Sequence, residues 1–283
     1  MPLTDPLNMD RLRRSLTTRC FGRTLRYLPQ TDSTNADALR HVQQFREAPV
    51  PHGMVILAES QRAGRGRRGR SWHSPAEGNI YCSLILASGA GTGTPLHALS
   101  WTPLASALAA ADALARQGNL PVVVKWPNDV MIKGKKVGGI LCEQTNTADK
   151  QSAVIVGIGL NINSDPADLP EDLQATATSL SAELHRPVDR TELVADLLLE
   201  LERRLDLLWR EGPDELAAEF SRRCDTLGKH VRITFSQQEQ VEGKALSIGE
   251  DGHLRVAVHP SGTGDEDDRT IEVRSADVVH LRG

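Results

Sequence analysis

Seven residues of the chain, Gly64 to Arg70, read Gly-Arg-Gly-Arg-Arg-Gly-Arg, with Arg62 before them and Trp72 after them. No acidic residue lies between Glu59 and Glu77, so the guanidinium groups of this arginine loop (Gly64 to Arg70) repel one another. Glycine allows a ligand to approach the backbone closely, and arginine presents forked donors that suit carboxylates and phosphates. The loop therefore predicts an anion site, and we expect it to become ordered when the anion binds.

Basic runs are also common as solvated surface, localisation signals or non-specific nucleic-acid patches. Apolar, strand-like residues flank the arginine loop at Met54–Ala58 and Asn79–Leu86, which predicts a connection between two strands. The formal net charge of the chain is −4, so the basic patch is local and no broad polyanion-binding face is expected. These two observations favour a small-anion site.

Two other segments place polar side chains at the ends of predicted elements. Asp32–Asn35 stands at a helix start, where hydroxyls, an amide and free backbone N–H groups point one way, although a plain N-cap is the simpler interpretation of this segment alone. Lys125–Asp129 ends a β-branched strand, the usual place for site residues in α/β folds. Pro127 stops that strand, so we expect Asn128 and Asp129 to turn outward, with an ordinary proline turn as the alternative.

Lys136 begins the next predicted strand, beside the glycines and apolar residues of Val137–Leu141. We expect little nearby that could screen or pair its charge, so the lysine is a candidate for chemistry. Gly157–Asn163 ends another apolar strand with two glycines and two asparagines, and those glycines permit close approach of something flat. A Walker A sequence is absent, so a nucleotide would be bound in another way.

The periodicity of the remaining residues predicts helices and strands that form a sheet with flanking helices. We expect helices at about residues 9–16, 33–46, 96–116, 191–210 and 213–224, and strands at 26–28, 54–58, 79–86, 121–126, 136–144 and 153–163. The residues 137–142 and 153–160 contain no charge, which predicts a sheet covered by helices. Pro103 is expected to kink or restart the long alanine-rich helix, and Gly89–Gly93 to form a turn.

The last part of the chain has a different pattern. Short strands are expected at residues 231–235, 241–248, 254–258 and 270–273, separated by Gly-Asp turns, which predicts a small β-barrel with the acidic run Asp265–Asp268 at a hairpin tip. We therefore divide the chain into a lead-in (1–20), a catalytic domain (21–224) and a C-terminal barrel (225–283).

Composition excludes several classes. With 283 residues, 39% apolar and 25% charged, the chain is typical of a soluble globular protein. No apolar run reaches the 18 or so residues of a membrane span, and Met1–Asp5 does not resemble a signal peptide. The four cysteines and nine histidines show no metal-binding spacing. We expect a cytoplasmic protein with reduced thiols and no intrinsic metal.

The motifs together resemble the biotin protein ligases, or biotin–[acetyl-CoA-carboxylase] ligases. GRGRRGR followed by Trp, then KWPND, KVGGIL and GxGxN occur in that family's order and spacing, after a Ser-Thr-Asn helix start. The resemblance covers about Thr31 to Asn163. It implies an α+β fold, with the mixed sheet and flanking helices of class II aminoacyl-tRNA synthetases and biotin ligases, followed by a small C-terminal SH3-like β-barrel. Only about 20 residues precede the catalytic part, too few for the DNA-binding domain of regulatory members, so specific DNA binding is not expected.

The family activates biotin with ATP, supplied with Mg²⁺ as MgATP, to biotinyl-5′-AMP, and then transfers biotin to a lysine of a biotin carboxyl carrier protein. By resemblance, the catalytic residues are Lys136 and Arg67. The biotin-binding residues implied are Ser33, Thr34, Asn35, Gln61, Arg65, Gly66, Arg67 and Lys136. The residues implied for ATP or the adenylate are Arg70, Trp72, Asn128, Asp129 and Asn161.

Two other functions compete with this one. A lipoate or octanoate ligase would share the fold, but GRGRRGR with its tryptophan and KWPND argue against it. A nucleic-acid-binding module is disfavoured by the acidic net charge and by only 4% aromatic residues. We expect the carrier protein as partner, no specific nucleic acid and no membrane, and we leave a homodimer open.

Overall fold

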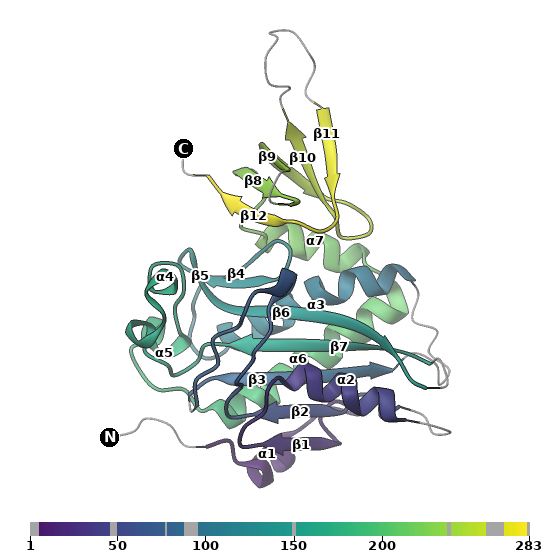
Figure 1. Cartoon of the computed structure of the whole chain (residues 1–283), viewed down its shortest axis with the longest axis vertical. Helices are drawn as coiled ribbons and strands as arrows, with labels where there is room; N and C mark the ends of the chain where they lie inside the picture. The colour runs from purple at the N-terminus through teal and green to yellow at the C-terminus, as the bar shows by residue number, and fades with distance from the viewer. Residues whose placement is uncertain are drawn as a thin grey trace.

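The computed structural model describes residues 6–45, 50–76, 78–87, 96–148, 151–236, 239–258 and 269–281. Within them, a seven-stranded mixed sheet with flanking helices is followed by a five-stranded antiparallel sheet (Figure 1). This arrangement confirms the predicted α+β class and the change of pattern near the C-terminus. The turn expected at Gly89–Gly93 and the acidic run Asp265–Asp268 lie outside the described residues.

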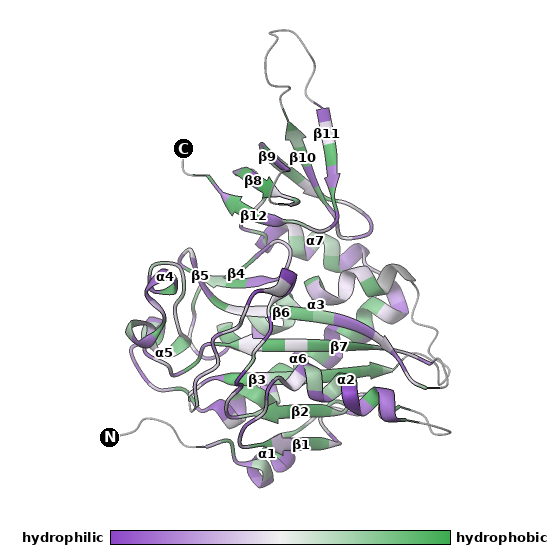
Figure 2. Cartoon of the chain, in the orientation of Figure 1, coloured by the Kyte–Doolittle hydropathy of each residue, from purple (hydrophilic) through white to green (hydrophobic). Residues whose placement is uncertain are grey.

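The large sheet has the strand order β1-β2-β3-β7-β6-β5-β4. Its strands are β1 (Leu25–Leu28), β2 (Val55–Ala58), β3 (Ile80–Ala87), β4 (Val122–Lys125), β5 (Asp129–Ile132), β6 (Lys135–Asn146) and β7 (Ser152–Leu160). β1 and β2 are parallel, and all the other neighbours are antiparallel. The central strands β3 and β7 are largely apolar because both faces of the sheet are covered (Figure 2). β5 was not predicted, since only three apolar residues separate Asp129 from the next turn.

The helices are α1 (Met9–Ser15), α2 (Thr34–Gln44), α3 (Leu96–Ala115), α4 (Glu171–Gln174), α5 (Leu180–Leu184), α6 (Arg190–Glu211) and α7 (Asp214–Arg223), with 3₁₀ turns η1 (Arg67–Gly69) and η2 (Pro166–Asp168). α3 contacts β4, β5, β6 and β7, and α2 contacts β2, β3, β6 and β7. α3 is one helix through Pro103, so the predicted restart is wrong. None of the helices in the described ranges has the length and apolar character needed to cross a bilayer.

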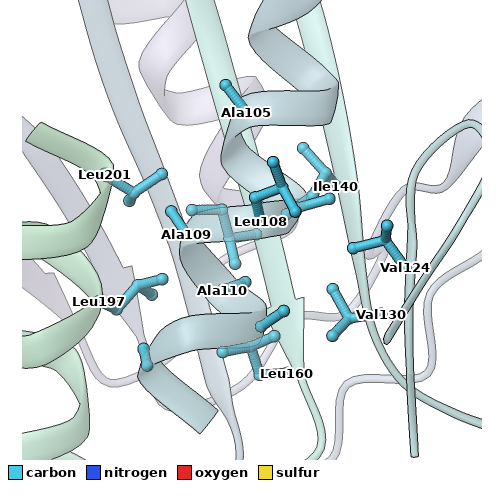
Figure 3. Packing of buried hydrophobic residues seen from close by; sticks show 14 of the residues in the cluster. Ala105, Leu108, Ala109, Ala110, Val124, Val130, Ile140, Leu160, Leu197 and Leu201 are labelled. Carbon is cyan, nitrogen blue, oxygen red and sulfur yellow. The ribbon is translucent and has the colours of Figure 1, made fainter. Parts of the chain in front are cut away.

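The core lies between the sheet, α3 and α6 (Figure 3). Ala105, Ala109 and Ala110 are buried on α3, and such small side chains let α6 and the sheet approach the helix closely. Leu108 is completely buried among them, so replacing it with alanine would cost about 2–5 kcal/mol of stability. This packing fixes the sheet from one side and leaves the other side for α2 and the arginine loop.

The C-terminal sheet has the order β11-β10-β9-β8-β12. Its strands are β8 (His230–Thr234), β9 (Gln240–Ile248), β10 (Leu254–Val258), β11 (Arg269–Val273) and β12 (Asp277–His280). All its neighbours are antiparallel. In the described part of the chain β11 and β12 do not pair with each other, so the small barrel is open along that seam. β12 was not predicted.

Backbone and indole hydrogen bonds fasten the two sheets together. Asp225 N donates to Val124 O at 2.8 Å, so the segment that leads from α7 to β8 runs parallel beside β4. The indole of Trp126 donates to Gly252 O at 2.9 Å, and the indole of Trp101 donates to Glu250 O at 2.6 Å. The tip of the β9–β10 hairpin is therefore held against α3, through Trp101, and against the segment that follows β4, through Trp126.

Candidate active site

A cavity of about 440 Å³ lies between the start of α2, the arginine loop, β6, β7 and β12. All residues predicted for the site line this cavity. They are Ser33, Thr34, Asn35, Gln61, Arg65, Gly66, Arg67, Arg70, Trp72, Asn128, Asp129, Lys136 and Asn161. Segments that are more than a hundred residues apart in the sequence thus converge on one hollow, although their individual roles stay predictions.

The floor of the cavity is a row of residues in register across five antiparallel strands, β4, β5, β6, β7 and β3. Lys125 pairs with Asp129, Asp129 with Gly139, Gly139 with Gly159, and Gly159 with Tyr81. Because directly opposed residues point to the same face, the two central glycines leave a flat, open patch in the middle of the row.

The indole of Trp72 lies on this patch. A Cβ atom added at Gly159 would come within 2.6 Å of the Trp72 ring, and one added at Gly139 within 3.2 Å. The ammonium of Lys136 is 5.1 Å from the centroid of the indole, within the range of a cation–π contact. The flat group that the glycines were expected to admit is, in this structure, the tryptophan that follows the arginine loop.

At one end of the cavity, Gln61 organises the start of α2. Its Oε1 accepts from Thr34 N at 2.9 Å and lies 3.2 Å from Thr34 Oγ1, while its Nε2 donates to Ser74 Oγ at 2.9 Å. Ser33 is the N-cap of α2, as predicted, and its hydroxyl oxygen accepts from Ala36 N. Ser33 and Thr34 are buried, so their polar groups are fixed before any ligand enters.

Asn35 lies across three strands at the same end. Its Nδ2 donates to Leu141 O at 3.2 Å and to Glu143 Oε2 at 2.8 Å, and its Oδ1 accepts from Ser83 Oγ at 2.6 Å. Gly157 makes room for this amide, since a Cβ at that position would be 2.2 Å from Asn35 Oδ1. Both amide hydrogens are used, so Asn35 can offer a ligand only an acceptor.

The other end of the cavity is charged. Lys136 Nζ lies 2.6 Å from Asp129 Oδ1, so the expectation that nothing nearby could pair this lysine is wrong. The pairing follows from the hairpin of β5 and β6, which returns the strand of Lys136 beside Asp129. The lysine and the aspartate are both partly exposed to the cavity, which leaves the ammonium accessible to an anion.

Asn128 does not turn outward as predicted. Its Nδ2 donates to Ile140 O at 2.8 Å, and its backbone oxygen accepts from Ile140 N at 2.9 Å, so the residue is bound to β6. Its Oδ1 accepts from Arg67 at 3.4 Å. Asn161 is similarly engaged, because its Nδ2 donates to Thr178 O at 3.1 Å. Both side chains line the cavity while holding its walls in place.

The arginine loop is tied to both sheets. Arg65 pairs with Glu143 of β6 at 2.7 Å, and Arg70 pairs with Asp277 of β12 at 2.6 Å. Arg68 donates to Thr234 O at 2.6 Å. These partners relieve the mutual repulsion of the guanidinium groups in the conformation described. Ordering of the loop by an anion stays a prediction.

Burial and neighbouring charges change the basicity of two cations in the cavity. Burial lowers the pKa of Arg67, and the carboxylates of Asp277 and Asp129 oppose that effect. Burial also lowers the pKa of Lys125, which has no carboxylate within ion-pair distance among the described residues. Lys125 therefore offers the cavity a second lysine besides Lys136.

Several residues of the site were not predicted. Ser83 and Glu143 touch Asn35, Lys125 lines the cavity, and Ala276 with the first three residues of β12 forms one wall. A lone serine within apolar β3, and the first acid after an uncharged run in β6, were the available signals. Nothing in the sequence indicated that β12 would reach this cavity.

Comparisons with known proteins identify the family of the chain. Residues 27–161 match the model of the biotin/lipoate A/B protein ligase family. The chain is 36% identical to the biotin–[acetyl-CoA-carboxylase] ligase of Mycobacterium tuberculosis, over 99% of this chain and 98% of that protein. It is 40% identical to the ligase of that name from Paracoccus denitrificans, over 60% of this chain and 68% of that protein.

Among solved structures, the biotin protein ligase from Aquifex aeolicus in complex with biotin and ATP superposes with a TM-score of 0.72. The sequences are 27% identical, and the match covers 92% of this chain and 100% of that one. The chain therefore belongs to the biotin protein ligases of the biotin/lipoate A/B protein ligase family.

Proposed function

We propose that the cavity activates biotin with ATP to biotinyl-5′-AMP and transfers biotin to one lysine of the biotin carboxyl carrier protein of acetyl-CoA carboxylase or a related carboxylase. The observation that supports this most directly is the cavity itself, with a neutral hydrogen-bonding end and a cationic end in one hollow. A bicyclic urea with a carboxylate tail needs both ends. The match over nearly the whole length to a biotin–[acetyl-CoA-carboxylase] ligase supports the same conclusion.

The neutral end suits the ureido ring of biotin. The ring has two N–H donors and one carbonyl acceptor, and Asn35 Oδ1 can accept from one donor. The hydroxyls of Ser33 and Thr34 stand beside it at the start of α2, where Ala36 N donates to the first and Gln61 accepts from the second. Arg65 and Gly66 close this end from the arginine loop. Because these groups are already fixed, binding costs little ordering entropy.

Adenylation takes place at the cationic end. A carboxylate oxygen of biotin attacks the α-phosphorus of ATP, a new P–O bond forms, and the bond to the β-phosphate oxygen breaks as pyrophosphate leaves with the electron pair. Two anions must meet in this step, and the ammonium of Lys136 offsets their repulsion and the charge that develops on phosphorus. Asp129 keeps Lys136 directed into the cavity.

The nucleotide is proposed to lie toward Arg70, Trp72, Asn128, Asp129 and Asn161. Mg²⁺ fits this end as part of MgATP, since the carboxylates of Asp129 and Asp277 line the cavity. Within the described ranges, no group of three or more His, Cys, Asp or Glu residues could hold a metal by itself. Magnesium commonly binds through phosphates and one or two carboxylates, so it would arrive with the nucleotide and neutralise phosphate charge.

Transfer of biotin to the carrier protein requires mainly that the acceptor lysine is held close to the acyl carbon. The neutral amine of the carrier lysine attacks the acyl carbon, a C–N bond forms, and the bond to the phosphate oxygen breaks as AMP leaves and the amine loses a proton. Holding the amine near the acyl carbon supplies most of the acceleration. The arginine loop, with Arg67 at its centre, covers the mixed anhydride and excludes the water that would hydrolyse it.

The test is exchange of labelled pyrophosphate into ATP by the purified chain, which should depend on biotin. Addition of a carrier domain should then give biotin on one lysine, detected by mass spectrometry. Exchange that depends on lipoate and not on biotin would overturn this function in favour of a lipoate ligase.

We further propose that the enzyme works in the cytoplasm, where carrier proteins of this kind are made. We also propose that residues 21–224 act as the catalytic domain and residues 225–283 as a small β domain. The sequence left a homodimer open, and sedimentation velocity measurements would decide between a monomer and a dimer.

A further inference from the structure

Glu143 stands on the cavity face of β6, two residues beyond Leu141, which lines the cavity. It is the first charged residue after the uncharged run that follows Lys136. Its side chain is only 26% exposed, and its partners are the two parts of the site that the sequence predicted separately, the helix start of α2 and the arginine loop. Neither the adenylation step nor the transfer step uses it.

One oxygen of this carboxylate accepts from both parts. Asn35 Nδ2 donates to Glu143 Oε2 at 2.8 Å, and Arg65 donates to the same Oε2 at 2.7 Å. Donors on both sides of an ionised oxygen form charge-assisted hydrogen bonds, which are roughly twice as strong as neutral ones.

The same carboxylate decides how the amide of Asn35 is oriented. Leu141 O and Glu143 Oε2 are both acceptors, so only the NH₂ end of the amide can face β6. The oxygen end then faces Ser83 Oγ and remains available to a ligand donor. The opposite orientation would place Oδ1 against two acceptors.

We propose that Glu143 is a positioning residue that sets the orientation of Asn35 for the biotin ring and anchors the arginine loop through Arg65. The part that concerns biotin rests on the function proposed above. The part that concerns the loop rests on the contacts alone. Glu143 therefore links the neutral end of the cavity, where the biotin ring is proposed to bind, to the position of the arginine loop.

The substitution that tests this is Glu143→Gln, which preserves the shape of the side chain. A glutamine amide has no charge, so even with its one oxygen in the place of Oε2 the hydrogen bonds from Asn35 and Arg65 would no longer be charge-assisted. The matched control is Glu242→Gln, because Glu242 pairs with Arg232 at 2.7 Å in the C-terminal sheet and does not line the cavity.

The first measurement is the rate at which trypsin cuts the arginine loop in the ligand-free protein, followed by mass spectrometry. E143Q should be cut about two- to five-fold faster than the wild type, as expected for loss of a partly exposed ion pair. E242Q should be cut at the wild-type rate. Arg65→Gln should reproduce the faster cutting, and E143Q should add nothing to it in that background. Thermal melts check that each variant is folded. If E143Q does not fold, R65Q takes its place as the test of the ion pair between Arg65 and Glu143.

The second measurement is the KM for biotin in pyrophosphate exchange. E143Q should raise this KM about tenfold or more, with kcat within about twofold, because a charge-assisted contact to the ring-binding amide is lost. Unchanged cutting and unchanged KM in E143Q would overturn the proposal, and so would a fall in kcat at constant KM. A wild-type protein without biotin-dependent exchange would instead refute the function, while the trypsin result would still decide whether Glu143 anchors the loop.

Discussion

The two ends of the cavity are built differently. At the neutral end, called the ring end below because the biotin ring is proposed to bind there, Thr34 and Asn35 are buried and hydrogen-bonded to Ser83 of β3. At the cationic end, called the phosphate end below, Lys136 is partly exposed and Arg70 is exposed, and each is held by an aspartate, one on β5 and one on β12. A neutral ligand can enter the first end without displacing any partner. An anion must compete with the carboxylates at the second, so recognition is preformed at one end and exchangeable at the other.

The largest effect is expected from Lys136→Ala, which removes the cation of the phosphate end. Biotin-dependent pyrophosphate exchange should fall about 100- to 1000-fold, the usual loss for one preorganised electrostatic donor. Lys135→Ala is the neighbouring control, since Lys135 is exposed and does not line the cavity, and it should stay within about twofold of wild type. A comparable loss in both variants would show that strand β6, and not the ammonium, was damaged.

A smaller but more selective loss is expected from Gly157→Ala at the ring end. The new methyl group would sit 2.2 Å from Asn35 Oδ1, so the amide must move. The KM for biotin should rise about tenfold or more, because a displaced polar contact costs about 1.5 kcal/mol or more, while the KM for ATP should change little. Steady-state kinetics with biotin and ATP varied separately would measure the two KM values. Equal changes in both would contradict the proposal that the two ends bind different substrates.

Arg67→Gly should loosen the cover between the ends without removing Lys136. Pyrophosphate release should fall by about tenfold or less, and biotinyl-AMP should escape and acylate lysines of a bystander protein. The measurement is pyrophosphate release beside a blot for biotin on added albumin. Complete loss of pyrophosphate release, as in the Lys136 variant, would assign Arg67 to the chemical step.

The smallest effect concerns stability where the C-terminal sheet meets the rest of the chain. Burial, with help from Lys125 and Lys229, lowers the pKa of His280 from 6.5 to about 4. Between these values the unfolded chain binds a proton that the folded chain excludes, so the free energy of unfolding should fall as the pH drops through this window. His280→Gln should flatten that dependence by about 1 kcal/mol between pH 7 and pH 5, measured by urea denaturation. Parallel pH profiles for the two proteins would show that His280 titrates normally.

The sequence predicted which residues line the cavity better than it predicted how these residues contact one another and which strands form the walls. Helix starts, strand ends and glycine spacing are local properties, so the positions of Ser33, Lys136 and Gly159 follow from them. The pairing of Lys136 with Asp129 depends on β5, a strand too short to have its own pattern. The wall formed by β12 depends on docking of two sheets, which no local pattern records. Single polar residues such as Ser83 acquire meaning only from what lies opposite them in three dimensions.

The four tryptophans of the chain occupy places that make them optical reporters of different events. Trp101 and Trp126 donate to carbonyls of the β9–β10 hairpin, so separation of the two sheets would expose both indoles to water and shift their emission to longer wavelength. Trp72 lies within the cavity, under Lys136, so its fluorescence would respond to a ligand that enters or to the departure of that ammonium. Trp209, beside His52, belongs to neither place. Variants that retain one tryptophan at a time would therefore report the two events separately. The fluorescence of Trp72 would report ligand binding in the cavity, and the emission wavelength of Trp101 or Trp126 would report docking of the C-terminal sheet.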